Sequence, residues 1–171
     1  MYSTFDKIDF FVFEKIIHRV KCKFLDKTMP FITHLGDLGL VWIVVILLLL
    51  INRETRQKGV FCAITLFLAT ISCNLVFKSI FKRVRPFERE DNIKLLITPP
   101  TTSSFPSGHT TSSFAVASAI FAFDKKFGAL ALFGAILIGF SRMYLYVHYP
   151  SDIIGGVFLG LICTLLTYIV F

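Results

Sequence analysis

The sequence predicts an all-α, polytopic membrane protein built from six helices. Hydrophobic residues make up 55% of the 171 residues, the mean hydropathy is +0.73, and apolar stretches recur at the length that a bilayer requires. A water-soluble domain of this size could not bury so much apolar surface. No linker, repeat or low-complexity tract divides the chain, so we expect one membrane-embedded domain over residues 1–171.

Five of the six helices are expected to span the membrane. The first expected span, residues 28–52, contains only two ionisable residues, His34 and Asp37. The second, residues 59–77, is uncharged throughout. The other three expected spans cover residues 108–123, 127–147 and 153–171.

The N-terminal segment, residues 5–24, has a different pattern. Apolar residues such as Phe10 and Ile17 are mixed there with charged residues such as Asp9 and Arg19. This pattern is typical of an amphipathic helix, which either lies in the membrane interface or spans poorly.

The order of the spans assigns the connecting segments to two faces of the membrane. Residues 52–58 and 124–126 are expected on one face, and residues 78–107 and 142–152 on the other. The charged and polar clusters of the last two segments therefore converge on one face, although they are far apart in the sequence.

The net charge of the chain is +7, from 18 Lys and Arg against 11 Asp and Glu. Nucleic acid is a common partner of basic proteins, but here the basic residues lie between apolar segments. We therefore expect no nucleic acid partner. An anionic lipid surface or a substrate that carries phosphate fits the charge better.

The first cluster on the shared face contains Lys78 and the pair Arg85-Pro86. Together with Lys82, the two basic residues have the spacing i, i+4, i+7, which predicts that they share one face of a helix. Such a basic helix end serves either to anchor the helix among lipid headgroups or to bind an anion.

The second cluster, Pro106-Ser107-Gly108-His109, opens the expected helix 108–123. Ser107 is a favourable N-cap, and Gly108 lets another group approach the backbone closely. Free N–H groups at a helix start bind anions such as phosphate. The alternative is an ordinary helix cap with a histidine at the interface.

The third cluster combines Arg142, His148 and Asp152. Arg142 lies within an apolar span, where ionisable residues are costly and usually functional. Asp152 follows Pro150 and either complements the dipole of the last helix or holds His148 in one tautomer and stabilises its cationic form.

These residues supply what cleavage of a phosphate monoester needs, without a metal or another cofactor. Cationic side chains neutralise the phosphate and its transition state, and Ser107 and Gly108 donate hydrogen bonds. One histidine attacks phosphorus and another protonates the leaving oxygen.

Three motifs in residues 78–152 carry a resemblance to a known family: Lys78-x6-Arg85-Pro86, Pro106-Ser107-Gly108-His109 and Ser141-Arg142-x5-His148-x3-Asp152. They resemble the three signatures of the type 2 phosphatidic acid phosphatase superfamily. The resemblance implies that His148 is the nucleophile and forms a phosphohistidine, that Asp152 orients His148, and that His109 is the general acid. It also implies a cradle for the phosphate formed by five residues: Lys78, Arg85, Ser107, Gly108 and Arg142.

The short chain with several spans looks like the small bacterial members of that superfamily. The resemblance therefore implies a lipid phosphatase of the cell membrane that acts on phosphatidylglycerophosphate, phosphatidic acid or undecaprenyl pyrophosphate. Two other functions remain open at this point. His109, His148 and Asp152 could ligate zinc in a hydrolase, or the basic cavity could belong to an anion or lipid transporter.

The distribution of basic residues and the family resemblance indicate opposite orientations in the membrane. If helix 5–24 does not span, the face with the three motifs carries thirteen basic residues: Lys7, Lys15, Arg19, Lys21, Lys23, Lys27, Lys78, Lys82, Arg83, Arg85, Arg89, Lys94 and Arg142. The other face carries five: Arg53, Arg56, Lys58, Lys125 and Lys126. The positive-inside rule would place the first face in the cytoplasm. The resemblance implies an active site on the outer face, and we expect that orientation because several of the thirteen are assigned to phosphate or to an interfacial helix.

Overall fold

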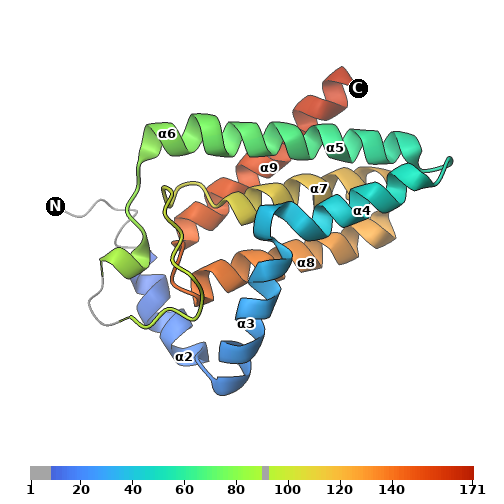
Figure 1. The fold of residues 1–171 in the computed structure, drawn as a ribbon. Coiled ribbons are helices and arrows are strands. Elements are labelled where there is room, and N and C mark those ends of the chain that lie inside the picture. The colour runs from blue at the N-terminus through green and yellow to red at the C-terminus, as the bar shows by residue number, and fades with distance from the viewer. Residues whose placement is uncertain (1–8, 90–92) are drawn as a thin grey trace.

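The structure is a computed structural model that describes residues 9–89 and 93–171. Everything regular in this part of the chain is helical, as predicted. Most of the longer helices lie roughly side by side in one bundle, whereas the N-terminal helices run at an angle to them (Figure 1). The start of the expected helix 5–24 and the basic residue Lys7 lie outside the described residues.

The centre of the bundle is the helix α7, Gly108–Phe123. Its neighbours are α8 (Lys125–Tyr144), α9 (Pro150–Val170) and α5 (Arg56–Ile71), and all three pack against it. Small side chains cover much of α7, including fully buried alanines at positions 115, 117 and 119. Because these side chains are short, the neighbouring helices approach α7 closely.

Two glycines of α9 mark the closest approach between α9 and α7. A Cβ atom on Gly160 would lie 2.7 Å from the backbone oxygen of Thr111, and one on Gly156 would lie 2.9 Å from the oxygen of Ser107. Real Cβ atoms do not approach a backbone oxygen so closely. The two helices therefore pack at this distance only because these positions have no side chain.

The helix α5 continues through the π-helical turn η3 (Ser72–Phe77) into α6 (Lys78–Phe81). It ends there because Lys82 adopts a left-handed backbone conformation with φ of 38°. The prediction that Lys78, Lys82 and Arg85 share a helix face is therefore wrong. Arg85 follows in extended chain, just before the 3-10 turn η4, Pro86–Glu88.

The expected single helix over residues 28–52 is also wrong. Two helices, α3 (Lys23–Leu35) and α4 (Leu40–Ile51), meet at a bend of 46°. The short turn η2, Asp37–Gly39, forms the bend with two left-handed residues, Leu38 at φ 52° and Gly39 at φ 72°. Before the bend, α3 packs on α8, and after the bend, α4 packs on α5.

The other helix boundaries differ from the prediction by a few residues. Only Asp124 separates α7 from α8, because its carboxylate accepts hydrogen bonds from the backbone N–H groups of Lys126 and Phe127 and so caps α8. Likewise α5 begins at Arg56 and α9 at Pro150, so both start before the expected residues 59 and 153.

The N-terminal segment is helical over residues 9–20 and includes a π-helical turn, η1 (Phe13–Ile17), followed by the short α2 (His18–Val20). Phe13 and Ile17 are fully buried in a cluster with Tyr146 and Tyr149. This segment therefore covers the connection between α8 and α9.

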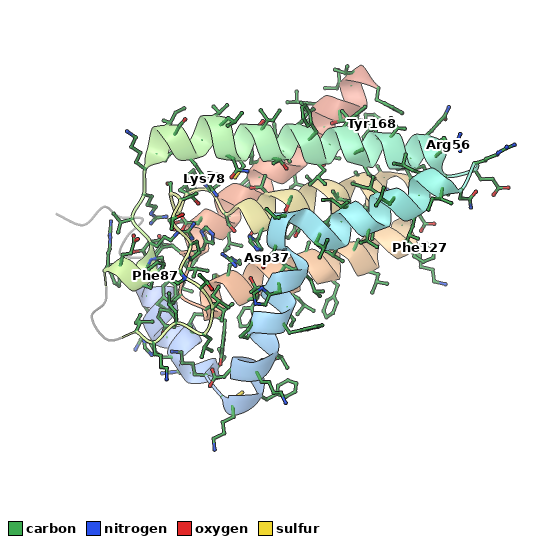
Figure 2. The ribbon with its side chains drawn as sticks, viewed as in Figure 1. Asp37, Arg56, Lys78, Phe87, Phe127 and Tyr168 are labelled. Carbon is green, nitrogen blue, oxygen red and sulfur yellow. The ribbon has the colours of Figure 1, made fainter. Side chains whose placement is uncertain are left out.

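Three helical stretches in the described residues are long and apolar enough to cross a membrane: Arg56–Glu88, Lys125–Tyr144 and Pro150–Val170. A fourth crossing results if the bent pair α3 and α4 counts as one span. Many large apolar side chains on α4, α5, α8 and α9 point outward, as expected for a surface in contact with lipid (Figure 2).

The connecting segments gather at two opposite ends of the bundle (Figure 1). The α4–α5 and α7–α8 connections lie at one end. The segment between α6 and α7 and the α8–α9 connection lie at the other, which is the arrangement expected from the order of the helices.

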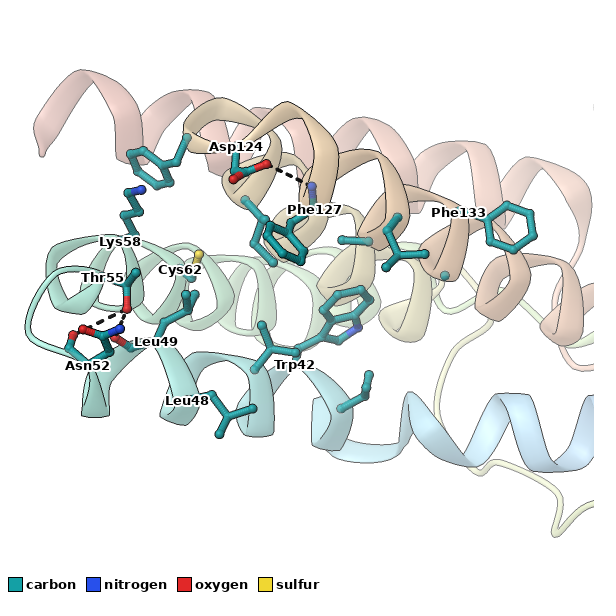
Figure 3. Close-up of a pocket in the computed structure, with 17 residues that line it drawn as sticks. Trp42, Leu48, Leu49, Asn52, Thr55, Lys58, Cys62, Asp124, Phe127 and Phe133 are labelled. Carbon is teal, nitrogen blue, oxygen red and sulfur yellow. Dashed lines mark hydrogen bonds between the residues drawn. The ribbon is translucent and has the colours of Figure 1, made fainter.

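An apolar groove of about 740 Å³ opens between α4 and α8, where the bend turns α4 away from α8 (Figure 3). Leu48, Phe127 and Phe133 line its walls, and Lys58 and Asp124 lie at its polar end. This groove is remote from the three motifs and lies towards the α4–α5 end of the bundle. We therefore interpret it as lipid-facing surface.

The close packing of α9 on α7 generates a stability prediction. We expect Gly160→Ala to lower the free energy of unfolding by about 1–3 kcal/mol, because its methyl group would overlap backbone of α7. Gly134→Ala is the matched control, since no atom lies within 4 Å of the added methyl group. Thermal unfolding of the two variants in detergent measures the difference, and equal stabilities would contradict the packing described here.

Candidate active site

Arg85 holds three segments of the chain together at the end of the bundle where the motifs meet. Its guanidinium donates hydrogen bonds to the backbone oxygens of Thr102 (2.8 Å) and Val147 (2.6 Å). The same group lies 3.3 Å from Nε2 of His148. Arg85 is 2% exposed, so its charge is directed at this site and not at solvent.

His148 lies in the connection between α8 and α9, between a cation and a carboxylate. Nε2 faces Arg85, whereas Nδ1 faces the carboxylate of Asp152 at 3.6 Å. A carboxylate on the Nδ1 side favours the tautomer with its proton on Nδ1. Nε2 then carries the lone pair, which faces the guanidinium of Arg85 and is the group that a nucleophile would use.

Burial lowers the pKa of His148 to about 3, although the neighbouring Asp152 acts in the opposite direction. The positive charges of Arg85 and Arg142 reinforce the effect of burial. Burial and the two cations therefore favour the neutral form of this imidazole.

Asp152 is fully buried in the first turn of α9 and is tied to several other segments. Its carboxylate accepts hydrogen bonds from the Ser104 hydroxyl, the Tyr149 backbone N–H and the Arg83 guanidinium. These partners compensate for the cost of burying a charge. They also fix the position of the carboxylate beside His148.

Arg83 is a residue whose role the sequence did not reveal. One of its terminal nitrogens pairs with Asp152 and the other with Asp9 at 2.6 Å, so its planar fork joins the N-terminal segment to α9. Asp9 also accepts hydrogen bonds from the backbone and the hydroxyl of Ser151. The only signal in the sequence was the density of basic residues after position 77, which does not distinguish Arg83 from its neighbours.

Arg142 projects from the last turn of α8 and is 4% exposed. One terminal nitrogen donates to the hydroxyl of Thr33 on α3 at 2.7 Å. Its Nε atom is buried and has no hydrogen-bond partner within the described residues. A buried donor of this kind is suited to an anionic ligand.

Lys78 and the start of α7 form the other side of the site. The Lys78 ammonium lies 3.3 Å from the hydroxyl of Thr102 and 3.6 Å from where a Cβ atom on Gly108 would be. A side chain at position 108 would therefore occupy the space beside this ammonium.

Ser107 acts as the N-cap of α7, as predicted. Its hydroxyl oxygen accepts a hydrogen bond from the backbone N–H of Thr110. Its own backbone N–H donates to the carbonyl of Asp152. The backbone N–H of Ser107 is therefore occupied, and the hydroxyl proton of Ser107 and the first amides of α7 are the groups suited to donate to a ligand.

His109 lies one residue into α7 and contacts a residue outside the three motifs. Its Nε2 atom is 2.8 Å from the carboxylate of Asp37, in the bend between α3 and α4. The charges of Arg142 and Lys78 also act on this imidazole. In Figure 2, Asp37 lies at the bend, on the side of the molecule towards Lys78 and away from Arg56.

The structure thus brings all eight residues singled out in the sequence to one end of the bundle. Three cationic groups, two imidazoles and a helix N-terminus surround one place, where they are suited to bind and cleave a phosphate ester. Across residues 9–89 and 93–171, no three His, Cys, Asp or Glu side chains are grouped so as to hold a metal ion.

Comparison with known proteins decides the family, because the model of the PAP2 superfamily matches residues 58–171. The chain belongs to this superfamily. The match includes all three motifs, so the family predicted from them is confirmed.

Proteins similar in sequence include an undecaprenyl-diphosphatase of Sulfolobus acidocaldarius, which is 34% identical over 85% of this chain and 70% of its own length. The undecaprenyl-diphosphatase BcrC of Bacillus subtilis is 32% identical over 81% of this chain and 70% of its own length. Among solved structures, LpxE of Aquifex aeolicus matches with a TM-score of 0.82 and 26% identity, over 98% of this chain and 96% of its own. A transmembrane PAP2-type phosphatidylglycerolphosphate phosphatase of Bacillus subtilis matches with a TM-score of 0.77 and 25% identity, over 98% of this chain and 86% of its own. The fold is therefore that of membrane PAP2 proteins.

The bridge made by Arg83 generates a prediction. We expect Arg83→Gln to lower the free energy of unfolding by about 3–5 kcal/mol, because it leaves the buried carboxylates of Asp9 and Asp152 without their cation. Lys82→Gln removes an adjacent, exposed charge and should change stability little. Chemical denaturation in detergent compares the two. A similar effect for both variants would mean that the bridge does not stabilise the fold.

Proposed function

We propose that this protein removes phosphate from a membrane lipid, from a phosphate monoester or a pyrophosphate, through a phosphohistidine intermediate at His148. The class of activity, that of a lipid phosphatase, is confirmed by relatives named as undecaprenyl-diphosphatases, lipid A phosphatases and phosphatidylglycerophosphatase B. The residue roles and the substrate are the proposal.

In the proposed first step, Nε2 of His148 attacks phosphorus and the bond from phosphorus to the leaving oxygen breaks. The leaving oxygen takes a proton from His109. Asp152 stabilises the positive charge that develops on the His148 ring.

In the second step, water attacks the phosphohistidine and His109, now neutral, accepts a proton from that water. The P–N bond breaks, inorganic phosphate leaves, and both imidazoles return to their starting forms. No metal ion or cofactor is needed for this sequence of bond changes.

The cationic groups act on the phosphate in this proposal. Arg142 offers its unpartnered Nε, Lys78 offers its ammonium beside Gly108, and Arg85 places charge next to the attacking nitrogen. Positive groups that are fixed in place stabilise the negative charge on the oxygens of the trigonal bipyramidal transition state.

The surroundings of the His148 ring give the main support for this proposal. The two nitrogens of His148 face opposite partners, with the carboxylate of Asp152 on the Nδ1 side and the cation of Arg85 on the Nε2 side. A histidine that binds zinc through Nε2 would not be placed against a guanidinium. The geometry therefore supports nucleophilic catalysis over the zinc hydrolase considered from the sequence.

We place the site at the outer face of the cell membrane, with five spans and the N-terminal segment lying against the site end. The likeness to relatives supports undecaprenyl pyrophosphate and phosphatidylglycerophosphate as candidate substrates. The resemblance of the three motifs adds phosphatidic acid as a third candidate. The contacts described above would touch only the phosphate, so they do not discriminate among the three lipids.

The role of His148 generates a prediction. His148→Ala should abolish phosphate release from all three lipids and should leave no phosphoenzyme when the reaction with a ³²P-labelled substrate is quenched in alkali, where phosphohistidine survives. His109→Ala should lower the rate by about 10²–10⁴-fold, because it removes protonation of the leaving oxygen. A His148→Ala variant that turns over at a normal rate would refute the assignment.

Orientation and substrate are tested together. In a Cys22→Ser background, which removes the exposed native cysteine, we would place a cysteine at Thr98 near the site and another at Glu54 at the opposite end. A membrane-impermeant thiol reagent applied to intact cells should label the Thr98→Cys variant and not the Glu54→Cys variant. The reverse pattern would place the site in the cytoplasm.

Phosphate release by the purified protein from the three lipids identifies the substrate. Repeating the assay with EDTA tests whether the activity is independent of metal.

A further inference from the structure

The bend between α3 and α4 brings a carboxylate to the proposed general acid. The sequence singles out His34 and Asp37 as the only ionisable residues of an otherwise apolar stretch, and none of the three motifs includes them. In the structure, one carboxylate oxygen of Asp37 lies 2.8 Å from Nε2 of His109, and the other lies 2.6 Å from Nδ1 of His34. Asp37 therefore bridges two imidazoles.

We propose that Asp37 is a positioning residue for catalysis, which holds His109 in orientation and keeps its proton available for the leaving oxygen. This proposal rests on the proposed function, because it assigns Asp37 to the general acid of that reaction. Asp37 itself does not touch the phosphate.

The charges around His109 give the physical reason for such a residue. The charged groups that face this imidazole are Arg142 from α8, Lys78 from α6 and Asp37 from η2. Burial and the two cations oppose protonation of this imidazole, and the carboxylate favours it. Without Asp37, nothing in this set would offset burial and the cations, and His109 would hold less firmly the proton that it must donate.

The backbone of the bend fixes the orientation of the His109 ring as well. A Cβ atom on Gly36 would lie 2.8 Å from Cδ2 of His109 and 3.0 Å from the side chain of Ile138. The ring is thus packed against the backbone that carries Asp37. Nε2 points to the carboxylate, and Nδ1 is the nitrogen left to face the substrate.

The backbone of the bend is in an unusual conformation, which supports a functional role. Leu38 is a non-glycine residue in the left-handed region, and its side chain is 97% exposed. Its side chain gains no burial that would offset this conformation. Residues held in such conformations cluster at functional sites, and here the conformation places Asp37 against His109.

His34 is the second partner of Asp37 and is well exposed, with 62% of its side chain accessible. Its contact uses the carboxylate oxygen that His109 does not use. His34→Gln therefore offers a matched control, because it changes a neighbour of Asp37 and leaves the contact with His109 in place.

Asp37→Asn tests the proposal, because the amide keeps the shape of the carboxylate and removes its charge. With phosphatidic acid, whose leaving group is an alkoxide that needs a proton, we expect kcat/KM to fall about 100-fold or more. With p-nitrophenyl phosphate, whose leaving group is stable as an anion, we expect a loss of less than about 10-fold. The descending limb of the pH profile with phosphatidic acid should also move to lower pH, because His109 would lose its proton more readily.

The double variant separates a positioning role from a structural one. In a His109→Ala background, Asp37→Asn should cause no further loss, because the group through which it acts is absent. Asp37→Glu, which restores the charge, should recover part of the activity, and His34→Gln should lose less than about 5-fold with phosphatidic acid.

Three results for Asp37→Asn would overturn the proposal: normal activity with phosphatidic acid, equal losses with both substrates, or a further loss in the His109→Ala background. A loss for His34→Gln as large as that for Asp37→Asn would also overturn it. A wild-type protein that releases phosphate from none of the three candidate lipids and not from p-nitrophenyl phosphate would instead refute the proposed function, so the two failures are distinguishable.

Discussion

The buried carboxylate of Asp152 is the constraint on which the site end of the molecule depends. A buried carboxylate must accept hydrogen bonds from protein groups in place of water. Here the donors are the Ser104 hydroxyl, the Tyr149 backbone N–H and the Arg83 guanidinium. Because Arg83 also binds Asp9, the N-terminal segment is drawn into the same network. His148 is positioned as a result, since its ring lies between this network and Arg85.

The bend at Gly36–Gly39 has two separate effects on the molecule. It directs α3 along α8, so that Thr33 meets Arg142, and it directs α4 away from α8 onto α5. One short turn therefore completes the side of the bundle that carries Arg142 and opens the apolar groove on the other side. Both effects follow from two left-handed residues in succession, a conformation that no continuous helix could accommodate.

Much of the fold and the site could be predicted from the sequence, because the relevant signals are local. Uncharged stretches marked the helices, Ser107 marked the start of α7, and the motifs marked the residues that meet at one end. The bend could not be predicted, because Gly39 is one glycine among apolar residues and Leu38 has no local preference for a left-handed conformation. The partners Arg83, Ser104 and Asp37 could not be identified because their roles arise only when distant segments meet.

The contact between Asp9 and Ser151 has a consequence for how the protein is made. The two residues are 142 positions apart, so the ribosome must synthesise the chain as far as Ser151 before this contact can form. Until α9 forms, Asp9 lacks the donors of Ser151, and Arg83 lacks the carboxylate of Asp152. A nascent chain arrested before its last helix therefore lacks the carboxylate that lies beside His148 and the network of hydrogen bonds that fixes it.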